Sequence, residues 1–177
     1  KGEISKINTN FQIIEMKEFI QQIYNDTEVS TKTHKIYLER DDVYEIKADV
    51  TLLQQAIRAL LENAMKYSEK GTNVYIKSAI IDGKNGEVSI RDEGVGISEE
   101  DSRRIFDRFY RVDDSRTKAT GGTGLGLAIV KRIVELHKGE IKINSELGKG
   151  TEISIVLPLV TQKTEIVPQR LRTNKKI

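Results

Sequence analysis

A glycine-rich stretch that runs into an apolar helix is the first candidate for chemistry in this sequence. It reads Gly122-Thr123-Gly124-Leu125-Gly126-Leu127-Ala128-Ile129-Val130. Glycine lacks a Cβ, so such a backbone can take positive φ and approach a ligand closely. The first N–H groups of the following helix have no partners within the helix, and together with the helix dipole they favour an anion such as phosphate. Tight connections that bind nothing show the same pattern, so the stretch alone leaves both interpretations open.

A second group of chemically suited residues lies on one face of a predicted helix. Asn63, Lys66 and Tyr67 have the spacing i, i+3 and i+4, so their side chains project together, with Glu62 beside them. An amide oxygen suits a metal, an ammonium suits phosphate, and an aromatic ring suits a base or ribose. The spacing therefore favours a nucleotide, although a solvated helix end, where lysine is favoured anyway, gives the same pattern.

A third candidate, Asp92-Glu93-Gly94-Val95-Gly96-Ile97, places an acid at the end of a predicted strand, followed by two spaced glycines. A flat ring can approach such a backbone closely. The Asp92 carboxylate accepts hydrogen bonds and the adenine amino group donates them; a bond to a charged group contributes about 1.5–3 kcal/mol. We expect Asp92 to face the ring and Glu93 to turn away. A tight turn that carries a surface acid is the alternative interpretation.

Composition limits the class of protein. The 177 residues suffice for one domain with a sizeable core, and 29 basic residues nearly balance 27 acidic ones, which argues against a nucleic-acid binder. There is no cysteine, no run of 18 apolar residues and no signal peptide, and the chain begins with Lys1 rather than Met. We therefore expect a cytoplasmic fragment of a longer protein, without direct membrane insertion by this chain. P-loop, Rossmann and Ser/Thr/Tyr kinase motifs are missing.

Periodicity predicts the elements that must position these residues. Apolar residues at helical spacing predict helices over 16–24, from the N-cap Asp49 to about Tyr67, and over 125–137, and Ser98 caps a short one. Polar residues predict a loop over 27–34 and a mobile lid over 107–121. A hairpin is expected to join the second and third of the predicted strands, which are 11–14, 36–38, 43–47, 74–80, 88–92, 140–145 and 151–157. This order favours an α+β fold, with a mixed, mostly antiparallel sheet of about five strands covered on one face by about three helices.

Together, these stretches resemble the catalytic and ATP-binding (HATPase) domain of bacterial two-component sensor histidine kinases, within the gyrase, Hsp90, histidine kinase and MutL superfamily. The match covers roughly Phe11 to Leu159. Five motifs occur in the family's order: an N box at 62–68, a G1 box at 92–97, an F box at 106–111, a G2 box at 122–130 and a final glycine box at 148–151. The F box and the Lys66-Tyr67-Ser68 ending favour the histidine kinase branch. The resemblance implies a two-layer α/β sandwich of the Bergerat type.

The resemblance also implies a role for each motif. Asn63 would coordinate Mg²⁺, Lys66 would contact phosphate and Tyr67 would pack on the nucleotide. Asp92 would bind the adenine amino group in a slot shaped by the G1 glycines, the segment 123–127 would hold the phosphates, and the F-box residues would lie on or near the lid. Asn63 would be the metal ligand, and Glu62 is the candidate catalytic residue that could orient a nucleophile. The nucleotide-binding residues implied are Asn63, Lys66, Tyr67, Asp92, Gly94, Gly96, Ile97, Arg108, Tyr110, Arg111, Gly122, Thr123, Gly124, Leu125, Gly126, Leu127 and Thr151.

Two departures from the family pattern affect this interpretation. Many members carry a first asparagine four residues before the metal ligand, where this chain has Ala59; we expect Asn63 to suffice. The phosphoacceptor is also missing, since the two histidines of the chain are His34 and His137. We interpret His34 as a surface loop residue and His137 as a residue at a helix C-terminus that favours a cation. A separate dimerisation domain of the same protein is therefore expected to carry the phosphoacceptor.

The expected function is transfer of the γ-phosphoryl group of MgATP to a histidine on that dimerisation domain, for relay to a response regulator, with ATP and Mg²⁺ as cofactors. Residues 1–10 would end a linker, 11–159 would form the kinase domain and 160–177 a flexible tail. The parent protein would be anchored in the cell membrane. Two alternatives stay open: a superfamily ATPase that uses Glu62 to activate water, and a nucleotide-regulated binding module of the anti-sigma-factor kind.

Overall fold

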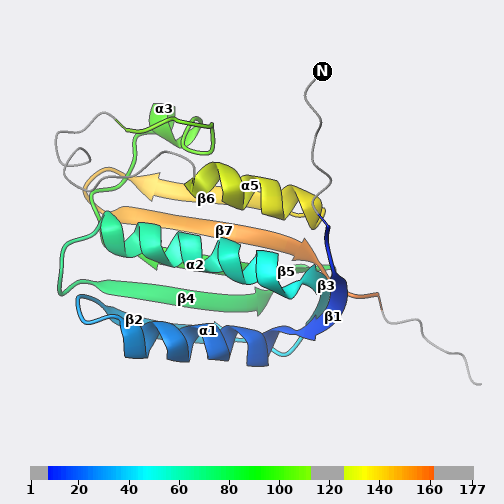
Figure 1. Ribbon diagram of the computed structural model, residues 1–177. Helices are drawn as coiled ribbons and strands as arrows, with labels where there is room; N and C mark the ends of the chain where they lie inside the picture. Colours follow the sequence, from blue (N-terminus) through cyan, green and yellow to red (C-terminus); the bar gives the residue numbers. More distant parts are fainter. Residues whose placement is uncertain (1–7, 113–125, 162–177) are drawn as a thin grey trace, which may run out of the picture.

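A mixed sheet of five strands forms the body of the protein in the computed structural model, which describes residues 8–112 and 126–161 (Figure 1). In spatial order the strands are β2 (Lys35–Asp41), β4 (Asn73–Ile80), β5 (Asn85–Asp92), β7 (Gly150–Pro158) and β6 (Glu140–Glu146). β2 and β4 run parallel, and the other neighbours are antiparallel. The predicted mixed, mostly antiparallel sheet is therefore confirmed.

Helices α1 (Met16–Ser30), α2 (Val50–Lys66) and α5 (Gly126–Leu136) all lie on one face of this sheet, with α2 in the middle (Figure 1). A short helix, α3 (Glu99–Ser102), follows β5. Asp49 caps α2 as predicted, since its side chain accepts the N–H of Leu52 at 3.0 Å. An apolar stripe at helical spacing is buried along the length of α2: Leu53, Ala56, Ile57, Leu60, Leu61 and Ala64. This packing fixes the C-terminal end of α2 over the sheet.

The predicted hairpin between the second and third strands is wrong. β3 (Glu45–Asp49) pairs with β1 (Phe11–Glu15) in a separate antiparallel sheet, whereas β2 pairs with β4. Asp42, which the hairpin would place in its turn, instead continues along β4. Its N–H donates to the Ser78 carbonyl oxygen at 2.9 Å, and its carboxylate accepts the N–H of Ile80 at 3.0 Å. These bonds hold the end of β2 against β4, so the chain cannot fold back to pair β3 with β2.

The first helix is longer than its apolar pattern predicts, and the predicted loop over 27–34 is wrong in its first half. α1 continues to Ser30. Thr27 is buried in its last turn, and its hydroxyl donates to the Ile23 carbonyl oxygen at 2.7 Å, so a polar side chain is satisfied within the helix. α2 ends at Lys66, one residue before the expected Tyr67.

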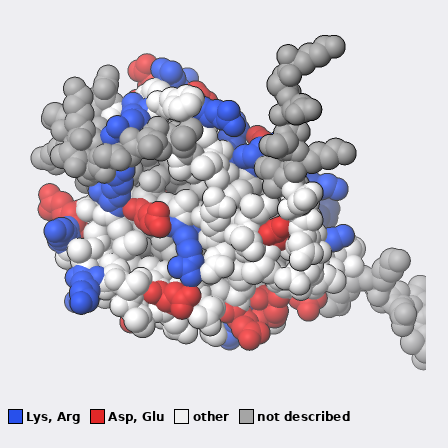
Figure 2. Space-filling view, viewed as in Figure 1, with Lys and Arg blue, Asp and Glu red and all other residues white. Residues whose placement is uncertain are grey.

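Charged side chains of both signs are interspersed on the helix-covered face of the molecule (Figure 2). One ion pair joins neighbouring helices, because Arg58 of α2 lies 2.9 Å from Asp26 of α1. Both side chains are 41% exposed, so we expect this pair to contribute less than about 1 kcal/mol. Among the helices that the structure describes, none is long and apolar enough to cross a membrane.

Candidate functional site

Asp92, the last residue of β5, lies at the centre of the predicted site. It is 9% exposed, and its Oδ1 accepts two backbone N–H groups, from Gly94 at 2.8 Å and from Thr151 at 3.3 Å. Burial raises the pKa of this carboxyl above its ordinary value, and the two N–H bonds oppose that rise. Among the described residues, every side-chain oxygen that is fully buried makes a hydrogen bond. The second oxygen of Asp92, Oδ2, makes none within the described chain. Oδ2 is therefore a free acceptor that can be reached from outside.

The loop after Asp92 contacts two neighbouring segments at its glycines. A Cβ on Gly94 would lie 2.4 Å from the carbonyl oxygen of Tyr67, at the end of α2. Gly96 has φ +71°, and a Cβ there would lie 2.0 Å from the carbonyl oxygen of Glu146 in β6. Glycine avoids both the clash and the backbone strain. The two predicted glycines thus let this loop pack tightly between α2 and β6.

The turn between β6 and β7 holds the same loop from the other side. The Gly148 N–H donates to the Val95 carbonyl oxygen at 2.7 Å. Gly150 has φ +121°, and a Cβ on it would lie 2.1 Å from the Asp92 carbonyl oxygen. The expected turn is present, and the close approach of Asp92 requires the glycine at position 150. Thr151, which follows them, reaches Asp92 through its backbone N–H, and its contact with a nucleotide stays a prediction.

The predicted polar face is present at the end of α2. Tyr67 caps the helix, and its N–H donates to the Asn63 carbonyl oxygen at 3.0 Å. The Lys66 ammonium lies 5.5 Å from the centre of the Tyr67 ring. Asn63, Lys66 and Tyr67 are half-buried, whereas Glu62 is exposed. Because the Tyr67 carbonyl abuts Gly94, this face adjoins the Asp92 loop.

Asn63 is the predicted residue suited to hold a divalent cation. Among the residues that the structure describes, no group of three or more His, Cys, Asp or Glu side chains could hold a metal ion. Mg²⁺ often takes only one or two protein ligands and completes its octahedron with phosphate oxygens and water. A single half-buried amide oxygen beside Lys66 fits that demand, provided that a bound triphosphate supplies the other oxygens.

The F-box residue Tyr110, which lies in the segment after α3, contacts that helix. The Tyr110 hydroxyl donates to the Asp101 carboxylate, and the Arg104 guanidinium lies 4.3 Å from the centre of the Tyr110 ring. This hydrogen bond lowers the pKa of Asp101 and raises that of Tyr110. Arg108 and Arg111 are exposed. Contacts of Arg108, Tyr110 and Arg111 with a nucleotide or a partner stay predictions.

The start of α5 is the described part of the predicted phosphate-binding stretch. Gly126 is the exposed first residue of α5, and Leu127 packs partly buried against the core. The N-terminal end of α5 and the C-terminal end of α2 point toward the same edge of the molecule (Figure 1). Gly122, Thr123, Gly124 and Leu125 lie outside the described residues, as does the predicted lid from residue 113 onward.

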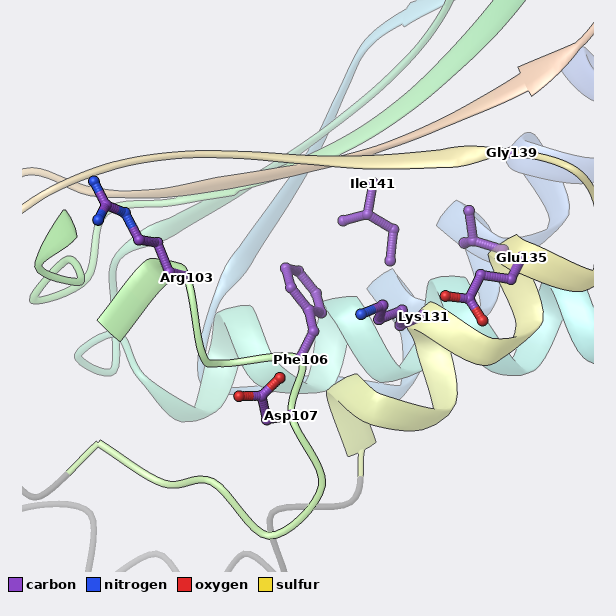
Figure 3. Close-up of a pocket in the computed structure, with 8 residues that line it drawn as sticks. Arg103, Phe106, Asp107, Lys131, Glu135, Gly139 and Ile141 are labelled. Carbon is purple, nitrogen blue, oxygen red and sulfur yellow. The ribbon is translucent and has the colours of Figure 1, made fainter. Parts of the chain in front are cut away.

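A cavity of about 300 Å³ is separate from this group of residues (Figure 3). It opens between α5, β6 and the segment after α3. The Phe106 ring and Ile141 face each other across it, and Lys131 reaches in from α5 (Figure 3). No predicted nucleotide-binding residue within the described part of the chain lines this cavity. We therefore place the candidate site at Asp92 and the end of α2.

His34 is not the surface residue that its loop position predicts. It is 9% exposed, and its Nε2 lies 2.9 Å from the hydroxyl oxygen of Ser68, the residue after Tyr67. That hydroxyl donates to the Ala64 carbonyl oxygen at 2.6 Å, so Nε2 is the donor to it. The longer α1 leaves only residues 31–34 before β2, and this short connection brings His34 against the end of α2.

His137 lies at the C-terminal end of α5, as predicted, but it is not the cation that this position favours. It is 5% exposed; Nε2 accepts the Asp49 N–H at 3.0 Å and Nδ1 donates to the Ile133 carbonyl oxygen at 2.7 Å. A ring that accepts at one nitrogen and donates at the other is neutral. His137 therefore links the end of α5 to the start of α2, and that it is not the phosphoacceptor stays a prediction.

Comparison with known proteins identifies similar chains. A family model described as "Histidine kinase-, DNA gyrase B-, and HSP90-like ATPase" matches residues 48–161. Sensor histidine kinase WalK of Bacillus subtilis (strain 168) is 39% identical over 157 residues, which are 84% of this chain and 25% of WalK. The chain spans 25% to 35% of the length of the first curated relatives that it matches.

Two solved structures share the fold. The mycobacterial sensor histidine kinase MprB has a TM-score of 0.73 at 28% identity, over 85% of this chain and 98% of that one. ShkA, solved at full length in complex with AMPPNP, has a TM-score of 0.76 at 27% identity, over 89% of this chain and 33% of that one. The sheet and its helical layer are thus arranged as in histidine kinases.

Proposed function

Because the chain belongs to the histidine kinase-, DNA gyrase B- and HSP90-like ATPase family, we propose that it is the ATP-binding catalytic domain of a sensor histidine kinase. In this proposal it transfers the γ-phosphoryl group of MgATP to a histidine on a separate dimerisation domain. A response regulator receives the phosphoryl group from that histidine. The names of the curated relatives, which are sensor histidine kinases, support this assignment.

The observation that carries the proposal is the Asp92 carboxylate. Its Oδ1 is fully engaged by the N–H groups of Gly94 and Thr151, so the free acceptor is Oδ2. An adenine ring packed against the loop at Gly94 and Gly96 would present its amino group, a donor, to that oxygen. The close packing of both glycines supports a rigid slot, because neither position has room for a side chain.

The end of α2 would serve the phosphate end of the nucleotide. Asn63 would hold Mg²⁺, which neutralises charge on the phosphates when bound, and Lys66 would add a second positive charge there. Tyr67 would pack on the nucleotide from the cap of the helix. These residues lie on a helix that is buried along its length, which keeps their positions fixed. Fixed positions matter because phosphoryl transfer depends on positioning and charge neutralisation.

The proposal extends to the remaining predicted residues and to the whole protein. The segment from Gly122 to Leu127 would hold the phosphates, and the F-box residues would meet the nucleotide or the dimerisation domain. Residues 11–159 would be the kinase domain. We place it in the cytoplasm, as part of a protein anchored in the cell membrane.

Incubation with ATP labelled at the γ-phosphate tests the proposal. This chain is mixed with and without a dimerisation domain that carries a phosphoacceptor histidine. The expected result is a label on that domain that is lost in acid and kept in base, and that disappears when the D92N variant replaces the wild-type chain. Ser89→Ala, which changes a buried serine on β5 away from the slot, is the matched control and keeps the label.

The same experiment separates the alternatives. Rapid phosphate release by this chain alone, reduced by Glu62→Gln, would replace the proposal with an ATPase that activates water. Binding of ATP and of a protein partner without either activity would replace it with a regulated binding module.

A further inference from the structure

Ser145 of β6 joins two segments of the candidate slot, although it belongs to none of the sequence motifs. Its Oγ accepts the Ile97 N–H at 2.8 Å. The same oxygen lies 3.0 Å from the Gly150 carbonyl oxygen and 2.7 Å from the Thr151 hydroxyl oxygen. A single half-buried hydroxyl thus contacts both the loop after Asp92 and the first residues of β7.

The donor and both acceptor sites of the Ser145 hydroxyl are satisfied by these three contacts. A serine hydroxyl has one proton to donate and two lone pairs that accept. The Gly150 carbonyl oxygen can only accept, so it takes the proton of Ser145. The Ile97 N–H and the Thr151 hydroxyl then fill the two lone pairs. No other common side chain of this size provides one donor and two acceptors at a single atom.

These contacts connect Ser145 to the free acceptor of the site. Thr151 donates its backbone N–H to Asp92 Oδ1, and together with the Gly94 N–H it engages that oxygen and leaves Oδ2 free. Ile97, on the other side of Ser145, lies in the loop that would form the floor under an adenine ring. Ser145 therefore fixes the distance between this floor and the carboxylate.

We propose that Ser145 is a positioning residue that gives this domain its preference for the adenine amino group. It touches no atom of the nucleotide and acts through Ile97 and Thr151. The inference rests on the proposed ATP-binding function and adds to it the residue that sets base selectivity. Loss of the hydroxyl would affect chiefly the interaction with the amino group, because only that interaction depends on the position of Asp92 Oδ2.

The test compares two nucleotides that differ at that group. Calorimetric titration measures the affinities of ATP and of purine riboside triphosphate, which lacks the 6-amino group. Ser145→Ala is expected to weaken ATP about tenfold and the analogue less than about threefold, so that the ratio of the two affinities falls. Ser145→Thr keeps the hydroxyl and restores the ratio. Ser154→Ala, at a buried serine of the adjacent strand β7, is the control and leaves the ratio unchanged.

Thermal unfolding of each variant is measured alongside. If Ser145→Ala does not fold, Ser145→Cys removes the strong acceptor at similar size and gives the same comparison. Equal loss of affinity for both nucleotides, or no loss for either, would overturn the role of Ser145 and leave ATP binding intact. Failure of the wild-type chain to bind ATP would instead overturn the proposed function, and this inference with it.

Discussion

Replacement of Asp92 by asparagine should separate adenine recognition from stability. The N–H groups of Gly94 and Thr151 both point at Oδ1, so the amide oxygen of D92N must occupy that position. The amide NH₂ group then takes the place of Oδ2 and meets the adenine amino group donor to donor. The lost bond to a charged acceptor contributes about 1.5–3 kcal/mol, which corresponds to about 10- to 150-fold weaker ATP binding.

The fold should tolerate this change. The amide oxygen still accepts both N–H groups, and the variant no longer buries a charge, a cost that the raised pKa of Asp92 reveals. We expect the free energy of unfolding to change by less than about 1 kcal/mol. Titration calorimetry with ATP and urea denaturation measure the two quantities on the same samples.

Glu93→Gln is the matched control, since it removes the same charge one residue away. Glu93 turns away from the slot, as expected, and its Oε1 accepts the Tyr75 hydroxyl at 2.7 Å. Its ATP affinity should stay within about twofold of wild type, because no part of its side chain reaches Asp92. If D92N binds ATP as tightly as Glu93→Gln does, the adenine slot is not at Asp92.

Three further predictions follow from the same site. Because burial raises the pKa of Asp92, the folded chain binds more protons than the unfolded one between pH about 4 and that raised pKa. The free energy of unfolding therefore falls as the pH rises through this window. The affinity for ATP needs the carboxylate, so it falls as the pH drops through the same window. An affinity for ATP that does not depend on pH would contradict this prediction. Gly96→Ala should destabilise the fold by roughly 2–4 kcal/mol more than Gly83→Ala in urea denaturation, since their φ angles are +71° and +72° but only the former places a Cβ against the Glu146 carbonyl. Equal costs would mean that the loop is not packed on β6. Asn63→Ala should abolish the dependence of ATP affinity on Mg²⁺, measured with the ion and with a chelator, and an undiminished response would move the metal ligand elsewhere.

Local patterns predict the helices and most strands, because each depends on neighbours a few residues away. Asp49 caps α2 through Leu52, and Ser98 caps α3 through Asp101, as their spacing indicates. The pairing of β2 is different. Its partner β4 runs parallel and lies beyond β3 and α2, so no short-range signal distinguishes it from a hairpin.

The residues of the candidate site likewise divide into those that a short sequence segment reveals and those that it does not. Asp92 and its glycines stand out because one short segment carries both an acceptor and a flexible backbone. Ser145, His34 and His137 do not, since each has a partner 34 to 88 residues away and single polar residues in strands or loops carry no motif. The burial of the two histidines depends on how α1, α2 and α5 pack, which periodicity alone does not reveal.

The bond between Asp92 and Thr151 spans 59 positions of the chain. The Asp92 carboxylate therefore lacks one of the two N–H groups that orient it in every partly folded state in which β5 and β7 are unpaired. A nucleotide that binds only the paired state stabilises it by mass action, by about 2.7 kcal/mol at a ligand concentration 100 times the dissociation constant. Under the proposed function, ATP is thus a ligand that stabilises the folded domain as well as its substrate.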